Sequence, residues 1–323
     1  MKAIRIYKFG PSDDVLQYED VPVPEPKAGE VLIKVEAASL NRADIGLRKG
    51  TYRISPDALP VIPGREFAGT VVKLGANVSE FKTGQRVVGY PSLGGYAEYA
   101  VAKTAEIRPV PDAVTSAQAA ALPTTSLTAW FGLLTDGNLK AGEWLLVQGG
   151  SSGVGVAAIQ IAKHIGAKVI TTSGSEEKCR RLRKLGADVT IDVSANDFVS
   201  EVMRVTDNRG VDVVLEMIGG EVYQKSVQVL APGGRLFSIG GAFGPIPDPP
   251  PALTEGRKAT RFSITNYLKA KPEDFSQLDT ILKLVQEKKF DVCIDKSFPL
   301  SETRAAQRYL EGREHFGKVM LTM

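Results

Sequence analysis

The chain has 323 residues, 43% apolar and 24% charged, and its 40 basic and 37 acidic residues leave a net charge of +3. This length predicts two domains, and the nearly balanced charge argues against nucleic acid as a partner. Two cysteines and two histidines exclude a four-cysteine zinc site and a disulfide framework. No apolar run reaches the roughly 18 residues of a membrane span, and the opening MKAIRIYKFG lacks a signal-peptide core, so we expect a cytoplasmic protein.

The first third of the chain has the pattern of β structure. Short alternating segments at 31–37, 64–74, 85–90 and 96–101 are separated by clusters of glycine and proline. Short strands with turn-rich spacing are typical of small closed sheets. We therefore expect a compact, barrel-like β domain here.

The pattern changes after Pro111. From Trp144 onward, continuous apolar runs alternate with amphipathic segments of helical spacing. This alternation predicts an α/β domain built on a doubly wound parallel sheet, whose strands are buried on both faces. The expected helices of this part cover 154–165, 176–185, 198–206 and 223–230.

The last quarter of the chain is mixed in character. Five prolines within 244–254 predict a surface loop. Amphipathic helices are expected at 276–287 and 300–310, and a closing strand at 317–323. The chain thus returns to the first domain, which would make that domain discontinuous.

The most informative segment is the glycine-rich turn between strand and helix at 145–170. Gly150 is expected to permit the tight turn, Gly153 to allow close approach of the backbone, and Gly155 to let the helix pack near the strand. The helix N-terminus, with Ser152 and Val154, would offer its N–H groups to a pyrophosphate. Ser152 replaces one glycine of the usual fingerprint, and a glycine turn without a ligand is the alternative.

The end of the next strand indicates which nucleotide is bound. An acidic residue there would hold the ribose of NAD, but this strand ends in small hydroxyl residues, including Ser173 and Ser175, followed by Lys178. These suit a 2′-phosphate, so the sequence favours NADPH. The cations at 178–184 are otherwise interpreted as the solvated face of a helix, with Lys178 the best placed exception.

Several strings carry a resemblance to a known family. In order they are PVIPGREFAGTVVKLGANVSEFKTGQRV, GGYAEYAV, ALPTTSLTAW, VQGGSSGVGVAAIQIAKHIGAKVI, GVDVVLEMIGG and GREHFGKVMLT. With them the chain resembles the medium-chain dehydrogenase/reductase superfamily, and within it the zinc-free quinone oxidoreductases. The resemblance implies a GroES-like β-barrel catalytic domain from 1–123 and 265–323, and a Rossmann NADP(H)-binding domain at 124–264. It also implies an active site in the cleft between them and a homodimer paired near 261–264.

Departures from the zinc-dependent members of the superfamily bear on the chemistry. The positions of the first two of their catalytic zinc ligands correspond to Asn41 and Arg65, and the third falls near Thr124; none of these residues is a usable ligand. The resemblance therefore implies no metal, and hydride transfer from NADPH to an activated acceptor such as a quinone. An enone or enoyl-thioester double-bond reductase is the alternative. A non-catalytic, crystallin-like or RNA-interacting relative is the remote one.

The resemblance also supplies candidate catalytic residues. Asn41 and Tyr52 match polar positions at the substrate mouth, where an amide or phenol could bond the acceptor oxygen. Asn41 could instead tie down its own loop, and Tyr52 could be a packed surface residue. Arg65 could stabilise developing negative charge, or form a structural ion pair with Glu66 or another acid.

The remaining candidates would bind the cofactor. Thr128 matches a threonine beside the nicotinamide, or is a helix threonine bonded to its own backbone. Gly240 would admit the nicotinamide ribose, and Phe243 lies where relatives bond the carboxamide through the main chain. Arg313 and Lys318 are candidates for the 2′-phosphate, with a solvated surface charge as the alternative for both.

Overall fold

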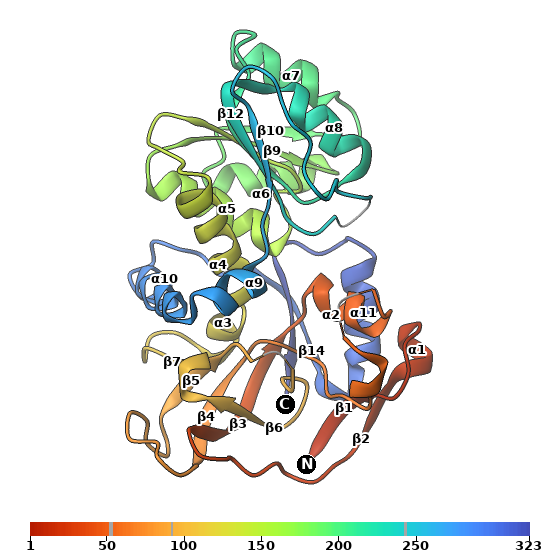
Figure 1. Ribbon diagram of the computed structural model, residues 1–323, viewed down its shortest axis with the longest axis vertical. Helices are drawn as coiled ribbons and strands as arrows, with labels where there is room; N and C mark the ends of the chain where they lie inside the picture. The colour runs from red at the N-terminus through yellow and green to blue at the C-terminus, as the bar shows by residue number, and fades with distance from the viewer. Residues whose placement is uncertain (52–53, 92, 242–243) are drawn as a thin grey trace. The chain divides into compact units, whose positions relative to one another are not determined.

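The computed structural model describes residues 1–51, 54–91, 93–241 and 244–323. The chain divides into two units, Met1–Thr124 with Pro272–Met323 (unit 1) and Thr125–Lys271 (unit 2), so both termini lie in unit 1 (Figure 1). The chain returns from unit 2 to unit 1 after Lys271, later than the expected boundary at 264, because α9 (Ile264–Ala270) belongs to unit 2. Its Tyr267 stacks on Phe131, with ring centroids 4.4 Å apart.

Unit 1 is built on a mixed sheet of seven strands in the order β14-β15-β3-β4-β5-β7, with β6 also paired to β3, and on a separate antiparallel pair β1-β2. The chain's last strand pairs antiparallel with β3, placing Met320 opposite Ser39. The strands are β1 (Lys2–Ile6), β2 (Leu16–Asp20), β3 (Glu30–Ser39), β4 (Phe67–Leu74), β5 (Arg86–Gly89), β6 (Tyr99–Lys103), β7 (Ile107–Pro109), β14 (Ile294–Pro299) and β15 (Lys318–Thr322).

Five α-helices of unit 1 accompany these strands. They are α1 (Ser12–Val15), α2 (Arg42–Arg48), α3 (Ser116–Ala120), α10 (Gln277–Gln286) and α11 (Thr303–Glu311). In the expected helix at 300–310, only the part from Thr303 is α-helical, because Leu300–Glu302 forms a 3₁₀ turn.

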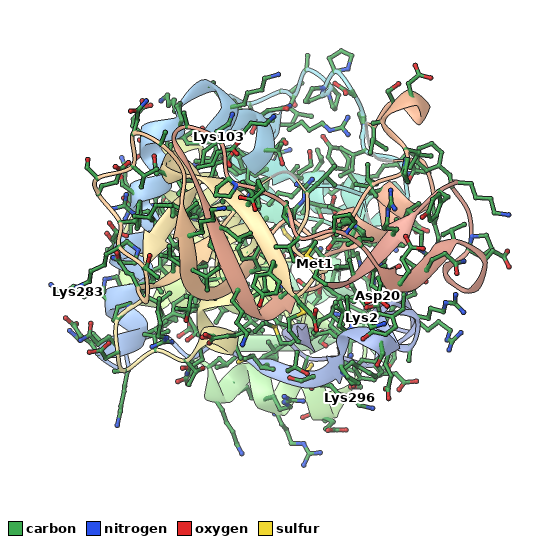
Figure 2. The ribbon with its side chains drawn as sticks, turned by 90° about the horizontal axis from the view of Figure 1, so that it is seen from below. Met1, Lys2, Asp20, Lys103, Lys283 and Lys296 are labelled. Carbon is green, nitrogen blue, oxygen red and sulfur yellow. The ribbon has the colours of Figure 1, made fainter. Side chains whose placement is uncertain are left out.

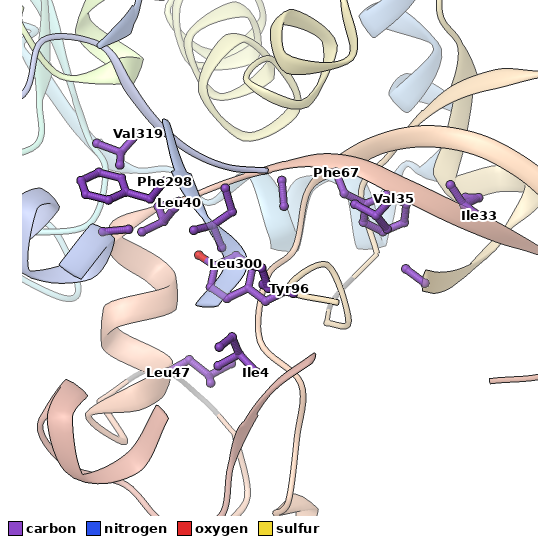
Figure 3. Packing of buried hydrophobic residues seen from close by; sticks show 14 of the residues in the cluster. Ile4, Ile33, Val35, Leu40, Leu47, Phe67, Tyr96, Phe298, Leu300 and Val319 are labelled. Atoms are coloured by element: carbon purple, nitrogen blue, oxygen red, sulfur yellow. The ribbon is translucent and has the colours of Figure 1, made fainter. Parts of the chain in front are cut away.

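The core of unit 1 gathers apolar side chains from both ends of the chain. Figure 3 labels Leu40, Val319, Leu300 and Tyr96 among the members of one buried cluster. The backbone N–H of Leu40 also donates to the carbonyl of Val319 at 2.9 Å. Polar side chains of the strands face the solvent. Lys2 on β1, for example, lies opposite Asp20 on β2 and donates to it at the surface (Figure 2).

Unit 2 contains a six-stranded parallel sheet in the order β10-β9-β8-β11-β12-β13. Numbered within this unit the order is 3-2-1-4-5-6, which is the dinucleotide-binding arrangement, with a topological switch between β8 and β11. The predicted α/β fold is confirmed. The strands are β8 (Trp144–Val147), β9 (Lys168–Ser173), β10 (Val189–Asp192), β11 (Val211–Glu216), β12 (Leu230–Ser238) and β13 (Lys258–Arg261).

The helices of unit 2 begin and end where local chemistry requires. Ser152, Ser175 and Asp197 cap helices by accepting a backbone N–H. The helices are α4 (Pro123–Trp130), whose first two residues belong to unit 1, α5 (Gly153–His164), α6 (Glu176–Lys184), α7 (Phe198–Val205), α8 (Gly220–Gln228) and α9. None of the helices in the described ranges combines the length and apolar character that a membrane span requires.

Two boundaries in unit 2 differ from the sequence prediction. Helix α8 ends at Gln228, and Leu230 already begins β12. The segment 261–264, expected to pair the homodimer, is not one strand: β13 ends at Arg261, and Ser263 caps α9 by accepting the N–H of Asn266. Periodicity identifies elements well but places their ends poorly, because caps depend on single residues.

Candidate functional site

The glycine turn follows β8, directly at the switch point of the parallel sheet. Gly149, rather than Gly150, holds the left-handed conformation of the turn, with φ of 73°. A Cβ on Gly150 would lie 2.0 Å from Thr171 Oγ1, and one on Gly155 would lie 2.6 Å from the Gly149 carbonyl oxygen. These two glycines therefore permit close packing of the turn against the sheet and of α5 against the turn.

The first turn of α5 carries backbone N–H groups that have no acceptor within the helix. Ser152 caps the helix, since its Oγ accepts the N–H of Gly155 at 3.1 Å. The N–H groups of Gly153 and Val154 lie in the first turn, where the helix has no carbonyl oxygen four residues earlier to accept them. They therefore need partners from outside the helix. A glycine cradle with free donors at a positive helix end fits the pyrophosphate of a dinucleotide.

A buried chain of hydrogen bonds holds this turn from behind. Thr172 Oγ1 accepts the N–H of Gly149 at 3.0 Å and donates to Gln148 Oε1 at 2.7 Å. The Gln148 amide then donates to Ser226 Oγ on α8 at 3.0 Å. The sequence gives no sign of these contacts, because they join residues at β8, β9 and α8, which lie far apart in the chain.

The end of β9 carries the residues expected to select the nucleotide. Ser173 is 4% exposed, and its Oγ has no hydrogen-bond partner among the described residues. Ser175 Oγ accepts the N–H of Lys178 at 3.4 Å and thereby caps α6. An orphaned hydroxyl at the carboxyl end of a strand, beside a helix N-terminus, fits a ribose or phosphate oxygen as its missing partner.

The other cofactor candidates of unit 2 lie on different elements. Thr128 is buried on α4. Gly240 follows β12 with φ of 81°, and a Cβ there would meet no atom within 4 Å, so its surroundings are open. Phe243 lies outside the described residues, as does the catalytic candidate Tyr52.

A buried polar cluster in unit 1 surrounds Glu66, which has no exposed surface. Its Oε1 accepts the Asn41 amide at 2.7 Å, the Lys318 ammonium at 2.8 Å, and the Ser39 hydroxyl. Its Oε2 accepts the backbone N–H of Thr124 at 2.6 Å. Two of the three positions that the resemblance matches to zinc ligands thus donate to one carboxylate, Asn41 through its side chain and Thr124 through its backbone.

Lys318 completes this cluster, and its contacts contradict the expectation that it binds a 2′-phosphate. Its Nζ donates to Leu40 O at 3.0 Å, to Asn41 Oδ1 at 2.9 Å and to Glu66 Oε1. An ammonium has three donors, so none remains for a 2′-phosphate. At 5% exposure Lys318 is not a solvated surface charge either.

Burial and charge set the protonation of the acids nearby. Burial raises the pKa of Glu66, but the Lys318 charge and the hydrogen bonds outweigh burial and leave it below its usual value. For Asp44 burial prevails: its pKa is raised, although Arg65, the Asn41 N–H and the Tyr96 hydroxyl oppose the shift. Burial and the Asp44 charge likewise place the pKa of Tyr96 well above its ordinary value.

Two arginine candidates lie in unit 1. Arg65 is buried, and its positive charge acts on Asp44, the acid of the first turn of α2. Arg313 follows α11 and is exposed. The pKa of Arg42 is lowered mainly by burial of Arg42 and secondly by the charge of Arg313. Across the described residues, no three His, Cys, Asp or Glu side chains come close enough to hold a metal ion.

Comparison with known proteins identifies the class of fold and then the family. The family model described as "Alcohol dehydrogenase GroES-like domain" matches residues 27–112, and that described as "Zinc-binding dehydrogenase" matches 153–283. A GroES-like domain beside a dinucleotide-type sheet defines an oxidoreductase of the medium-chain dehydrogenase/reductase type.

Individual relatives narrow the class. Quinone oxidoreductase of Sus scrofa is 34% identical over 100% of this chain and 98% of its own length. Escherichia coli quinone oxidoreductase, solved with NADPH, has a TM-score of 0.92 at 28% identity, covering 100% of both chains. The CurK enoyl reductase has a TM-score of 0.90 at 29% identity, covering 100% and 99%. The chain belongs to the quinone oxidoreductase family.

Proposed function

We propose that the protein is a cytoplasmic, NADPH-dependent reductase that transfers hydride to a quinone without a metal ion. The observation that carries this proposal is the Glu66 cluster. Asn41 and Thr124 stand where zinc-dependent relatives have metal ligands, and both are bonded to Glu66, whose charge is balanced by Lys318. An amide and an ion pair in this place favour hydrogen bonding to an acceptor oxygen over Lewis-acid catalysis.

The roles of the residues follow from this arrangement. NADPH, when bound, supplies the hydride. An N–H of Asn41 donates to the quinone oxygen on which negative charge develops. A proton from Tyr52 or from water then completes the hydroquinone, so that one hydride and one proton are added to the quinone.

The preference for NADPH is proposed to depend on the end of β9. Ser173 offers an unpartnered hydroxyl, and Lys178 is the first cation of α6. A cation near a 2′-phosphate favours NADPH over NADH by a charge-assisted bond. We expect Lys178→Ala to weaken NADPH binding about tenfold and NADH binding little, whereas Arg180→Ala on the same helix changes neither. Equal affinity for the two nucleotides, unchanged in Lys178→Ala, would remove this argument.

An enone or enoyl-thioester reductase is the second candidate. The likeness to CurK enoyl reductase supports it, and the same N–H of Asn41 could stabilise an enolate oxygen instead of a quinone oxygen.

Steady-state kinetics separates the two candidates. NADPH oxidation is measured with 1,4-benzoquinone, 9,10-phenanthrenequinone, trans-2-hexenal and crotonyl-CoA, each against a blank without enzyme. The proposal expects the highest kcat/KM with a quinone. Turnover of crotonyl-CoA or hexenal, with quinone rates no higher than the blank, would replace it by the second candidate.

We also infer a homodimer that pairs through β13. This strand ends the order of the parallel sheet and is paired on one side, to β12. An edge strand of this kind can join a second copy. Light scattering after size exclusion should give twice the mass of the chain. Ala259→Pro should halve it, because the N–H of Ala259 faces away from β12, whereas that of Phe262, three positions later, donates to Ser238; a monomer in both would contradict the inference.

A further inference from the structure

The Glu66 cluster joins segments that are far apart in the chain. Ser39 ends β3, Glu66 directly precedes β4, and Lys318 begins β15. Lys318 and Asn41 are 277 positions apart, yet their side chains are bonded inside the protein. Such a cluster is costly to build, because each buried charge must be compensated.

The bonds of this cluster determine how the Asn41 amide is turned. Its Oδ1 accepts from the Lys318 ammonium, and its Nδ2 donates to the Glu66 carboxylate. Turning the amide over would place N–H groups against an ammonium and a carbonyl oxygen against a carboxylate. Both contacts would be repulsive, so one orientation alone is compatible with the ion pair.

In this orientation one N–H of the Asn41 amide is not used by the cluster. An amide nitrogen has two N–H donors, and within the described residues Asn41 Nδ2 makes one hydrogen bond, to Glu66. The second N–H therefore has no acceptor among these residues and can donate to a bound molecule. The ammonium on Oδ1 also draws electron density from the amide, which strengthens its remaining N–H as a donor.

We propose that Glu66 and Lys318 are positioning residues that hold Asn41 as a hydrogen-bond donor to the acceptor's oxygen. The proposal rests on the proposed function in one respect, namely that Asn41 touches the acceptor. It names the class of acceptor more closely: a molecule with a carbonyl oxygen that gains negative charge when hydride arrives. The same carboxylate bonds the N–H of Thr124 and so fixes the start of α4.

A double-mutant cycle tests whether the pair acts through Asn41. The variant E66Q/K318M removes both charges together, so neither is left buried alone. Its glutamine has one acceptor oxygen in place of two, so it accepts from Asn41 or from Thr124 but not from both, and its NH2 can donate. The Asn41 amide is then no longer held in one orientation. This variant is compared with wild type, N41A and N41A/E66Q/K318M.

The expected outcome is non-additive. Loss of one oxyanion donor typically costs about a hundredfold or more in kcat, so N41A should fall by about that factor. E66Q/K318M should lower kcat about tenfold in the wild-type background and less than about twofold in the N41A background. The dissociation constant for NADPH should stay unchanged in all variants. A full tenfold loss in both backgrounds would show that the pair acts independently of Asn41 and would overturn the proposal.

A control separates positioning from stability. Arg48, like Lys318, is a buried cation of unit 1 that is paired with a glutamate, Glu311 at 2.9 Å. We expect R48M to lower the melting temperature and to leave kcat unchanged. A loss of kcat in R48M equal to that in E66Q/K318M would show that any buried ion pair of this unit has the same effect.

A second variant covers the case in which E66Q/K318M does not fold. N41D retains the oxygen that faces Lys318 but has no N–H, so kcat should fall to the N41A level. Retention of the wild-type rate in N41D would overturn the donor role. Should the wild type reduce no quinone, the cycle is measured with whichever enone or enoyl-CoA it does reduce, so failure of the quinone assignment is distinguished from failure of this inference.

Discussion

The effect of a substitution in the glycine turn after β8 can be predicted from the distances around Gly150. In Gly150→Ala, the new Cβ would lie 2.0 Å from Thr171 Oγ1 and 3.2 Å from Leu182 Cδ1. Carbon and oxygen do not approach this closely, so the turn must move away from β9 by about 1 Å. The donors of the first turn of α5 would move with it.

The size of the effect follows from this displacement. Overpacking of a filled site costs about 1–3 kcal/mol, which lowers the melting temperature by about 2–4 °C for each kcal/mol. A misplacement of about 1 Å can weaken a positioned interaction up to a hundredfold. We therefore expect NADPH to bind Gly150→Ala at least tenfold more weakly than wild type.

The assay is NADPH titration followed by nicotinamide fluorescence, together with thermal unfolding without nucleotide. Gly132→Ala is the matched control, since its Cβ would come no closer than 4.0 Å to Phe262 and is expected to change neither quantity. Gly150→Ala combined with Thr171→Ala removes the clashing oxygen and should recover part of the affinity. The recovery is partial, because the bond from Thr171 Oγ1 to the Val147 carbonyl is lost, at a cost of about 1 kcal/mol.

Two results would refute this reasoning. Wild-type affinity in Gly150→Ala would show that the turn does not hold the nucleotide. Weak binding that Thr171→Ala fails to relieve would show that the cause is not the contact with Thr171 Oγ1.

Three further predictions concern buried polar groups. Thr172→Val removes the acceptor of the Gly149 N–H, so we expect a loss of about 1–3 kcal/mol in stability and weaker NADPH binding, measured by denaturant unfolding and titration. Ser173→Ala removes an orphaned hydroxyl, so NADPH should bind severalfold more weakly with no loss of stability; a lower melting temperature with unchanged affinity would assign it a structural role. The pKa of Glu66 is lowered in the folded state, so its ion pair with Lys318 stabilises fully above the unfolded-state value of about 4.3 and is lost as the pH falls through the folded value. The difference in stability between wild type and E66Q/K318M should therefore shrink on acidification below about pH 4, and a difference that grows there would contradict the sign.

The fold could be predicted from the sequence to a large extent, because its signals are local. Continuous apolar runs alternating with amphipathic segments indicated the parallel sheet, and the six strands are found in the expected part of the chain. The glycine turn was recognisable from a short string, although the left-handed residue is Gly149 and not Gly150. Strand and helix ends were less predictable: Leu230 begins a strand where helical spacing continued.

The candidate sites were predicted unevenly. Ser152 and Ser175 are helix caps, a role that depends on neighbours three positions away. The hydrogen bonds of Thr172 with Gly149 and Gln148 could not be predicted from the sequence, because they join the end of β8 to β9. The sequence did single out Asn41, but from a resemblance and not from the bonds that orient it.

The sequence alone determined the two kinds of domain, the return of the chain's end to the first of them, and the scarcity of cysteine and histidine. The tertiary structure alone decided what Lys318 does. In the sequence it is a lysine at the start of the expected closing strand, equally compatible with solvent or with a phosphate. In the fold it meets Glu66, 252 positions away, inside the protein. Antiparallel pairing of β15 with β3 brings these charges together, and a buried charge must find its partner wherever the register of the sheet places it.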